Sequence, residues 1–396
     1  MIYLDNAATS WPKPDCVAQA MSEVLLTAGG NPGRSGHLAS LEAGRRVYST
    51  REAIASLCGL TDPLRVVFTQ NATEGLNLAL RGQLRPGDHV ITSSMEHNAV
   101  MRPLRYLEEQ GVEITVVPCS PQGELNPDDI APAIKSNTVM IALNHASNVT
   151  GTIQPVSEAG RIAREHGLLL LVDAAQSAGL IPLDMERDRI DLLAFTGHKA
   201  LLGPQGTGGL LIGEEVDLEW LQPLIRGGTG SRSAAEIQPE LLPDRYESGT
   251  RNAPGLAGLA AALSWLEKKG WDKIRQREAN VAQRLHNGLR DIPGVTVYGT
   301  QGMDHNTGVV SFNIDNVAPS TVGLELEEEF EILCRVGLHC SPASHRTIGT
   351  YPTGTVRLSP GCFTTETEID SVLTAVDKLA TKAAGKIGRA SCRERV

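Results

Sequence analysis

Two residues of opposite charge follow neighbouring apolar runs near the middle of the chain. Asp173 comes directly after "LLLLV", and Lys199 stands in "FTGHKALLGP" with glycines on both sides. Alone, Asp173 would suit a helix cap or an ion pair, and Lys199 would suit the surface. Together they offer a desolvated amine nucleophile and a carboxylate partner. That pair is what pyridoxal phosphate requires: a Schiff-base lysine and an acid for its protonated pyridine nitrogen.

The phosphate of such a cofactor needs hydrogen-bond donors, and the segment "NATEG" offers them. It follows the strand-like "RVVFT" and opens a helical pattern, so its backbone N–H groups, the helix dipole and the Thr73 hydroxyl favour an anion. Other phosphate loops fit less well. The segment "GPQGTGG" lacks the Gly-Lys-Ser/Thr ending of a nucleoside triphosphate loop and precedes a strand-like run, and no dinucleotide fingerprint occurs.

A third candidate is the thiol of Cys340 in "RVGLHCSPASH", which could be a nucleophile, a metal ligand or a small buried residue. Buried structural cysteines are commoner than reactive ones, so the segment alone does not decide. The glycine and proline around Cys340, with His339 adjacent, fit the partly exposed loop that a nucleophile needs. A zinc site built from Cys340, His339 and His345 lacks a fourth ligand at suitable spacing, and we expect no metal.

These residues need a scaffold that brings them together. From Leu64 to Ile212 short apolar runs alternate with helical patterns, which predicts an α/β fold with a mostly parallel sheet. The predicted strands are "RVVFT", "DHVITSS", "EITVVP", "VMIAL", "LLLLVDAA" and "DLLAFT", and "PVSEAGRIAREHG" predicts a crossover helix. Ligands of such sheets bind at the carboxyl ends of the strands, where this chain is rich in polar side chains.

After "ESGTRNAPG" the pattern changes to long helices and short strands. We predict an N-terminal segment that joins the small domain (1–15), a large cofactor-binding domain (16–253) and a smaller α+β C-terminal domain that carries the cysteine loop (254–385). The last residues, 386–396, show no periodicity, and codons for them can spell a sequencing adapter. We therefore predict a non-native tail there.

Composition excludes several classes of partner. The net charge of −10 over 396 residues argues against nucleic acid or an anionic membrane surface, because both favour basic patches. No apolar run is long enough to span a membrane and no secretory signal is present, so we expect a cytoplasmic location. The seven cysteines are scattered and include no C-x-x-C pair, which predicts reduced thiols rather than a disulfide framework.

An ordered set of motifs carries a resemblance to a known family. The motifs are "YLDNAAT", "GNPGRSGH", "NATEG", "EHNAV", "SNVTGT", "DAAQSAG", "TGHKALLGPQGTGGL", "ESGTRN", "GLHC" and "TVRLSP". From residue 2 to 384 the chain resembles the class V aminotransferases and, among them, the cysteine desulfurases, nearest to the branch of the sulfur-mobilising desulfurase and selenocysteine lyase. The resemblance implies fold type I of the pyridoxal phosphate enzymes, with a seven-stranded, mostly parallel sheet, and a homodimer.

The resemblance also implies a role for each matching residue. Lys199 would bind the cofactor covalently and act as the general base, and Asp173 would hold the pyridine nitrogen protonated. Gln176 would hydrogen-bond the phenolic oxygen, and His97 would stack over the ring. The remaining assignments are the phosphate contacts Thr73, Thr196, His198 and, from the neighbouring subunit, Thr250, and the substrate carboxylate contacts Arg357 and Asn148.

The implied reaction converts L-cysteine to L-alanine, while Cys340 takes the sulfur as a persulfide and passes it to an acceptor protein or thiol. A selenocysteine lyase would use the same residues on L-selenocysteine. A class V aminotransferase would not need the thiol, and a non-enzymatic sulfur-relay scaffold would not need Lys199 and Asp173. Leu338 stands where the nearest desulfurases often carry another histidine, which leaves substrate preference and acceptor open.

Overall fold

The computed structural model of the chain describes residues 1–27, 29–33, 36–232, 234–300 and 302–393, with side chains as far as residue 385. In the order of the chain, the helices of eight residues or more are α1 Asp15–Thr27, α2 Leu38–Leu57, α3 Ala72–Gln83, α4 Asn98–Glu108, α5 Val156–Glu165, α6 Ala253–Lys269, α7 Trp271–Asp291, α8 Pro319–Phe330 and α10 Glu366–Arg393. The short helix α9 spans Pro342–Thr347.

The larger sheet has seven strands in the order β2-β8-β7-β6-β5-β3-β4. These are β2 Val66–Thr69, β3 His89–Ser93, β4 Glu113–Val117, β5 Thr138–Asn144, β6 Leu169–Asp173, β7 Leu192–Thr196 and β8 Gly208–Ile212. Neighbours pair in parallel except β8, which runs antiparallel to both β2 and β7. The six apolar runs are strands, and "PVSEAGRIAREHG" is helix α5, so the predicted α/β class with a mostly parallel sheet is confirmed.

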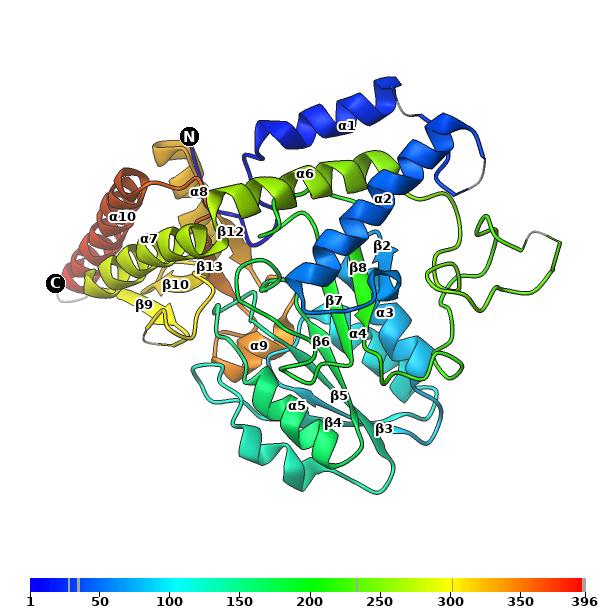
Figure 1. Ribbon diagram of the computed structural model, residues 1–396. Helices are drawn as coiled ribbons and strands as arrows, with labels where there is room; N and C mark the ends of the chain where they lie inside the picture. Colours follow the sequence, from blue (N-terminus) through cyan, green and yellow to red (C-terminus); the bar gives the residue numbers. More distant parts are fainter. Residues whose placement is uncertain (28, 34–35, 233, 301, 394–396) are drawn as a thin grey trace.

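Helices cover both faces of this sheet (Figure 1). Alternate residues of each strand point to opposite faces, so β6 gives Leu170 and Val172 to the core under α2, α5 and α6. Leu171, between them, enters the core under α3 and α4. Burial on both faces explains why the strands read as continuous apolar runs rather than as alternating ones.

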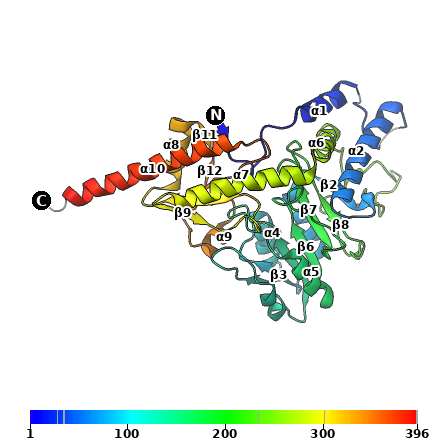
Figure 2. The same cartoon turned by 60° about the vertical axis from the view of Figure 1, so that its left-hand side comes forward.

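The second sheet is antiparallel and lies in the C-terminal part of the chain. Its strands are β9 Val295–Tyr298, β10 Val310–Ile314, β12 Arg335–Gly337 and β13 Thr355–Leu358, in the order β12-β13-β10-β9. Helices α7, α8 and α10 pack on it through a separate apolar core. Figure 2 shows α10 projecting away from the rest of the chain. It continues to Arg393, through most of the predicted tail, whose origin stays a prediction.

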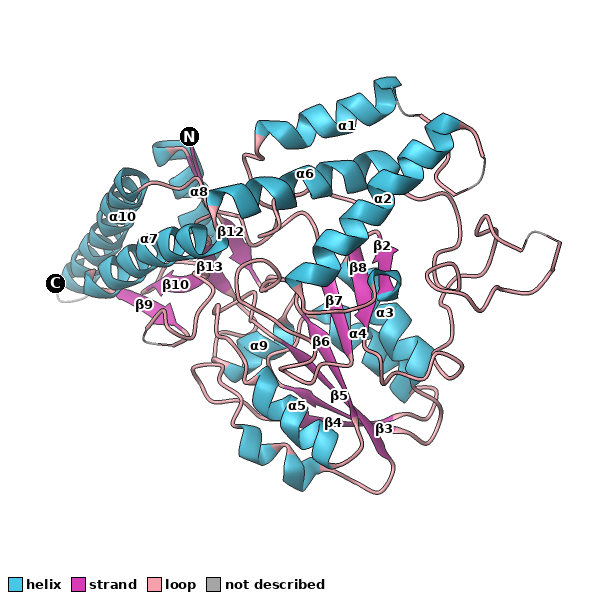
Figure 3. Cartoon of the chain, viewed as in Figure 1, coloured by secondary structure: helices cyan, strands magenta, loops and turns pink. Residues whose placement is uncertain are grey.

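The N-terminal segment returns to this second part of the molecule. Strand β1 Ile2–Tyr3 pairs in parallel with β11 Ile332–Leu333, and Asp5 bridges to Ser359. Between β8 and α6, the described residues 213–232 and 234–252 contain no helix or strand and form a long loop, which projects beyond β2 and β8 (Figure 3). None of the helices in the described ranges is long and apolar enough to cross a membrane. The predicted domain limits stay a proposal.

Candidate active site

One cavity at the carboxyl ends of the large sheet gathers most of the predicted site residues. Those that line it are Thr73, His97, Asn148, Asp173, Gln176, Thr196, His198 and Lys199. The strand register brings them to one level, because Asp173 at the end of β6 lies opposite Asn144 of β5 and Ala194 of β7. The turn after β7 then places Lys199 beside the end of β6. The sequence reasoning missed the two other polar residues of the lining, Asn71 and Asn144.

One end of the cavity is the N-terminus of α3. Asn71 caps this helix, and its side chain accepts a hydrogen bond of 3.0 Å from the backbone N–H of Glu74. Asn71 was detectable from the sequence, because an asparagine that begins a helical pattern and precedes a glutamate by three residues marks a cap. Gly208 allows strand β8 to lie close to the backbone of Asn71, because a Cβ added at Gly208 would lie 2.6 Å from Asn71 Cα. Unpaired N–H groups of a first helical turn attract anions.

Two buried polar atoms of the cavity lining lack a hydrogen-bond partner among the residues that the structure describes. They are Nδ1 of His198 and Oδ1 of Asn144. A buried polar group without a partner is costly, so such atoms indicate a place for an external ligand. Together with the helix N-terminus, the lysine and the carboxylate, they match the donor and acceptor set of pyridoxal phosphate. The residues present therefore fit that cofactor.

Burial in this cavity shifts the pKa values of both Lys199 and Asp173, and each charge partly opposes the shift of the other. Burial lowers the pKa of Lys199 to about 8, although the Asp173 carboxylate acts in the opposite direction. For Asp173, burial has the opposite effect and raises the pKa. The hydrogen bond from the backbone N–H of Ala175 and the charge of Lys199 partly offset this increase. An amine with a pKa near neutrality is suited to nucleophilic and general-base work.

His97 caps helix α4 and faces the same cavity. Its Nδ1 accepts a hydrogen bond of 3.0 Å from the backbone N–H of Ala99, which fixes the ring. Burial and the nearby Lys199 lower the pKa of His97 to about 4. The imidazole is therefore neutral at physiological pH and offers an uncharged aromatic face.

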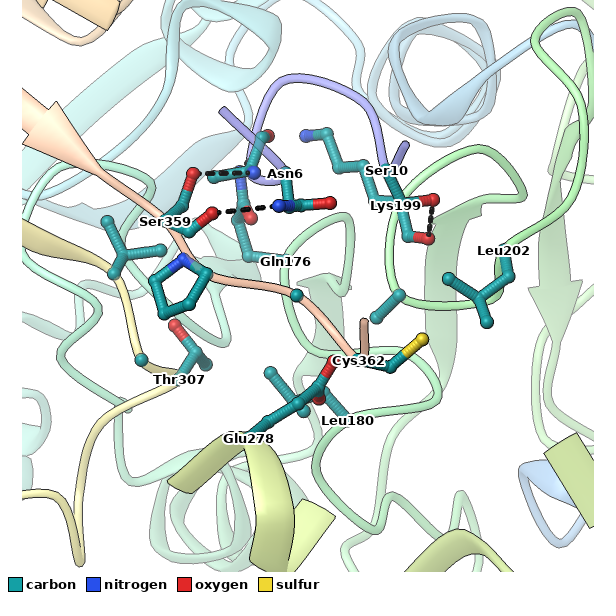
Figure 4. Close-up of a pocket in the computed structure, with 16 residues that line it drawn as sticks. Asn6, Ser10, Gln176, Leu180, Lys199, Leu202, Glu278, Thr307, Ser359 and Cys362 are labelled. Carbon is teal, nitrogen blue, oxygen red and sulfur yellow. Dashed lines mark hydrogen bonds between the residues drawn. The ribbon is translucent and has the colours of Figure 1, made fainter. Parts of the chain in front are cut away.

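The N-terminal segment forms part of the wall around Lys199 (Figure 4). Ser10 Oγ donates a hydrogen bond of 2.8 Å to the carbonyl of Lys199, and Gln176 Nε2 donates one of 3.0 Å to the carbonyl of Ala7. On the other side, Asn6 Nδ2 donates to the carbonyl of Ser359 at 3.0 Å. A second cavity lies among these residues, on the far side of Gln176 and Lys199.

Arg357 is fully buried next to the cavity rather than in its lining. Its Nη2 forms an ion pair of 2.6 Å with Asp5, and its Nη1 donates to the carbonyl of Asn148 at 3.1 Å. The Nε atom has no hydrogen-bond partner in the described part of the chain. Sequence reasoning missed Asp5, although it lies in the motif "YLDNAAT", because its partner is 352 residues away.

Cys340 lies on an adjoining groove and is the exposed one among the six cysteines that the structure describes. The groove shares Thr73 and His97 with the cofactor cavity, so the thiol opens toward it. The Arg335 guanidinium, which the sequence reasoning also missed, lies 4.0 Å from the sulfur. Arg335 thus places a positive charge beside the exposed thiol.

The backbone of this loop is held in an unusual conformation. His339 and Cys340 both have positive φ, 48° and 58°, which for residues with side chains costs roughly 1–3 kcal/mol each. Asn148 spans the two residues, since its Nδ2 donates to the carbonyl of His339 and its Oδ1 accepts from Ser341 Oγ, both at 2.6 Å. The side chain of Asn148 is thus occupied by the cysteine loop, in addition to facing the cavity.

His339 and His345 do not form a metal site with Cys340. Each ring pairs with a threonine, His339 with Thr355 at 3.1 Å and His345 with Thr350 at 2.6 Å. Burial lowers the pKa of His339 to about 2. Within the described ranges, no cluster of histidine, cysteine and acidic residues has the geometry of a metal site.

Thr250 lies outside the cavity, on the projecting loop. It is exposed, and its hydroxyl accepts a hydrogen bond of 3.4 Å from Asn31. Thr250 belongs to the motif "ESGTRN", whose first residue, Glu247, anchors the loop. Glu247 is buried and pairs with Arg51 through contacts of 2.5 and 2.7 Å. Glu247 also accepts a hydrogen bond from the backbone of Phe68 in β2. This anchor presents Thr250 outward from the edge of the large sheet.

Comparison with known proteins gives one consistent result. The profile of the Aminotransferase class-V family matches residues 2–372. The probable cysteine desulfurase of Methanothermobacter thermautotrophicus is 34% identical over 96% of this chain and 94% of its own length. The apo structure of a cysteine desulfurase from Thermococcus onnurineus NA1 superposes with a TM-score of 0.90 at 32% identity, covering 96% and 95% of the two chains.

A cysteine desulfurase CsdA from Escherichia coli superposes with a TM-score of 0.85 at 29% identity, over 96% of this chain and 94% of that one. These matches extend over nearly the whole chain and include both sheets. The resemblance seen in the sequence motifs is thereby confirmed, together with the fold and the enzyme class. The chain belongs to the class V aminotransferase family and, within it, to the cysteine desulfurases.

Proposed function

We propose that the protein converts L-cysteine to L-alanine with pyridoxal phosphate as cofactor, and that Cys340 carries the released sulfur as a persulfide. The single observation that carries this proposal is the groove that joins the exposed Cys340 thiol to the cavity of Lys199 and Asp173. An aminotransferase has no need of a thiol at that position. A silent scaffold has no need of a buried lysine whose pKa is lowered to about 8.

In this proposal each residue has a task set by its surroundings. Asp173 pairs with the pyridine nitrogen, Gln176 with the phenolic oxygen, and the neutral ring of His97 stacks over the cofactor. The α3 N-terminus with Thr73, Thr196 and His198 binds the phosphate. Pyridoxal phosphate, once bound, supplies an electron sink for the bonds at the substrate's α-carbon.

Lys199 removes the α-proton of the substrate, because its amine is neutral at mildly alkaline pH. Arg357 binds the substrate carboxylate, for which its Nε is a donor that has no partner among the described residues. The Cys340 thiolate attacks the substrate sulfur. The electron pair of the carbon–sulfur bond stays with the substrate carbon, which then takes up a proton. The product leaves as alanine, and Cys340 keeps the sulfur as a persulfide.

The test is to incubate the cofactor-loaded protein with L-cysteine and dithiothreitol and to measure sulfide and alanine. We expect equal amounts of both from the wild-type chain. Cys340→Ala should keep the visible absorption of the bound cofactor and lose most sulfide release, whereas Cys16→Ala, a half-buried cysteine, serves as the control and should retain activity. Pyruvate in place of alanine, or undiminished sulfide release from Cys340→Ala, would contradict the proposal. A parallel assay with L-selenocysteine compares the two substrates.

A further inference from the structure

The groove that holds Cys340 does not end at the sulfur. It opens into a second groove between α4 and α9, and the two share Asn98, Arg102 and Tyr106. We call the combined feature the arginine groove and define it by Arg102, Arg105, Tyr106 and Arg346, with Cys340 at one end. Its floor on the far side is apolar and includes Met101, Val116 and Pro342. The thiol therefore lies at the end of an extended surface feature.

The charge of the arginine groove is opposite to that of the chain as a whole. The chain carries a net charge of −10, yet four arginines (Arg81, Arg102, Arg105 and Arg346) line the groove against one acidic residue, Glu109. Arg105 is neutralised by Glu108, with contacts of 2.8 Å to both carboxylate oxygens. Arg346 lies 4.4 Å from the ring centre of Tyr351 rather than on a carboxylate. Arg102 forms no ion pair with the described residues.

The exposed tyrosines at the arginine groove and its apolar floor are typical of a surface that contacts another protein. Tyr106 in the groove is 48% exposed, and Tyr351, which lies beside Arg346 outside the groove lining, is 47% exposed. Exposed tyrosines beside arginines over an apolar floor are enriched at protein interfaces, whereas charged pairs that neutralise each other are not. Nucleic acid fits less well, because the strong negative charge of the rest of the chain would repel it.

We propose that the arginine groove binds an extended acidic segment of a sulfur-acceptor protein and guides the cysteine of that segment to Cys340. This inference rests on the proposed function, since it requires a persulfide on Cys340. The occupant must be extended because the groove continues from the thiol to Arg346 on α9. It must carry more than one negative charge because neither Arg102 nor Arg346 has a carboxylate partner among the described residues.

The transfer itself needs no added oxidant or reductant. The thiolate of the acceptor attacks the outer sulfur of the Cys340 persulfide and forms a new sulfur–sulfur bond. The bond between the two sulfurs of the enzyme persulfide breaks, and Cys340 leaves as a thiolate. The acceptor becomes the persulfide and keeps the hydrogen of the outer sulfur.

The probes are three synthetic nonapeptides with a central cysteine, flanked on each side by four residues that are all acidic, all neutral or all basic. The holoenzyme is loaded with radiolabelled sulfur from cysteine, and the second-order rate of transfer to each peptide is measured. We expect the acidic peptide to react at least ~10-fold faster than the neutral one at 20 mM NaCl, the range that electrostatic steering supplies. The advantage should shrink at 300 mM NaCl because salt screens the charges.

Arg346→Glu, alone and combined with Arg105→Glu, tests the surface. Both residues are exposed and neither has a catalytic task. The variants should lose the preference for the acidic peptide but keep wild-type sulfide release with dithiothreitol. Arg161→Glu makes the same charge change on an exposed arginine of α5, on the other face of the sheet. This control should keep both the preference for the acidic peptide and the wild-type sulfide release. Fluorescence anisotropy with a labelled acidic peptide, its cysteine replaced by serine, reports binding without any turnover.

The outcomes separate this inference from the proposed function. Absence of sulfide and alanine with dithiothreitol would refute the proposed function itself. Normal release with dithiothreitol, but equal transfer to all three peptides, would overturn the arginine groove alone. A faster reaction with the basic peptide, or a change of oligomeric mass in Arg346→Glu, would also overturn it, because the groove would then serve another partner or a second copy of the chain.

Discussion

At the scale of single residues, the feature that distinguishes this site is the way Ser341 and Asn148 hold the cysteine. Two successive residues with positive φ would relax if their hydrogen bonds were lost. Ser341 is fully buried, and its hydroxyl is the donor to Asn148 Oδ1. We infer that Ser341, which does not line the cofactor cavity, positions Cys340 for attack by acting through Asn148.

Ser341→Ala should therefore slow the reaction of the cysteine and leave the cofactor in place. It removes the hydroxyl and leaves Asn148 Oδ1 buried without that donor, a loss of roughly 1–3 kcal/mol. We expect sulfide release to fall by about tenfold for each 1.4 kcal/mol that reaches the transition state, with the visible absorption of the cofactor unchanged. Ser344→Ala is the matched control, since Ser344 is buried nearby but donates to the carbonyl of Met95. An equal decline in both variants would show a general packing effect.

The lowered pKa of Lys199 gives a second prediction at this scale. The amine must be neutral to attack the aldehyde of the cofactor, and its neutral fraction rises with pH through a pKa of about 8. The rate at which the stripped protein recombines with pyridoxal phosphate should thus rise with a midpoint near pH 8, followed by visible absorption. Asp173→Asn should shift this midpoint downward, because the carboxylate raises the pKa of Lys199. A midpoint above pH 10 would mean that the lysine is solvated.

At the scale of elements, the turn between β3 and α4 contains a buried acid that the proposed mechanism does not use. Glu96 is fully buried, and burial raises its pKa to about 8. It contacts Ser93 Oγ at 2.6 Å and accepts a hydrogen bond of 2.9 Å from the backbone N–H of Asn144 in β5. A neutral Glu96 thereby ties the end of β3 to the end of β5, whose Asn144 lines the cavity.

Glu96→Gln should preserve these contacts and change the pH dependence of stability. The folded protein keeps the proton of Glu96 up to about pH 8, whereas the unfolded chain loses it near pH 4.5, so unfolding becomes easier as pH rises between these values. Glutamine imitates the neutral acid and carries no such penalty. Thermal unfolding at pH 5 and pH 8.5 should show a smaller decline of Tm for the variant than for the wild-type chain. A steeper decline in the variant would show that Glu96 is ionised in the folded state.

Individual elements show how far the sequence could predict this structure. The strands of the large sheet and the polar residues at their ends were predictable, because a strand and the turn after it are contiguous in sequence. The short helix α9 was not, since it spans only Pro342–Thr347 and depends on contacts of Ser344 and Thr347 with Met95 and Ser94, about 250 residues away. The Asp5–Arg357 ion pair could not be predicted either, because its partners are also far apart in the sequence. Local patterns identify chemistry, whereas long-range hydrogen bonds determine its geometry.

At the scale of the whole molecule, the position of Thr250 matters most. Glu247 and Arg51 form a buried ion pair that anchors the loop, and the loop presents Thr250 outward instead of toward the cavity of its own chain. This arrangement supports the proposal of a homodimer in which Thr250 reaches the phosphate in the neighbouring subunit. Removing one partner of the buried pair, as in Glu247→Gln, should cost about 3–5 kcal/mol of unfolding free energy.

Mixed dimers test the role of Thr250 directly. Lys199→Ala and Thr250→Ala homodimers should each have low activity. A hybrid of the two contains one site with an intact lysine and, from the other subunit, an intact threonine, so it should recover up to half of the wild-type activity. Differently tagged subunits, co-expressed and purified in two steps, provide the hybrid. If Thr250 acted within its own chain, neither site of the hybrid would be complete and activity would stay low.

The contacts of the N-terminal segment have a practical consequence. Residues 5–10 contact Arg357, Gln176 and Lys199, so the backbone around them is ordered only when both parts of the molecule are assembled. Susceptibility of this segment to limited proteolysis should therefore report on the integrity of the catalytic centre. A cut there would inactivate a chain whose sheets and helices are otherwise complete, and a simple gel would reveal it before any assay of turnover.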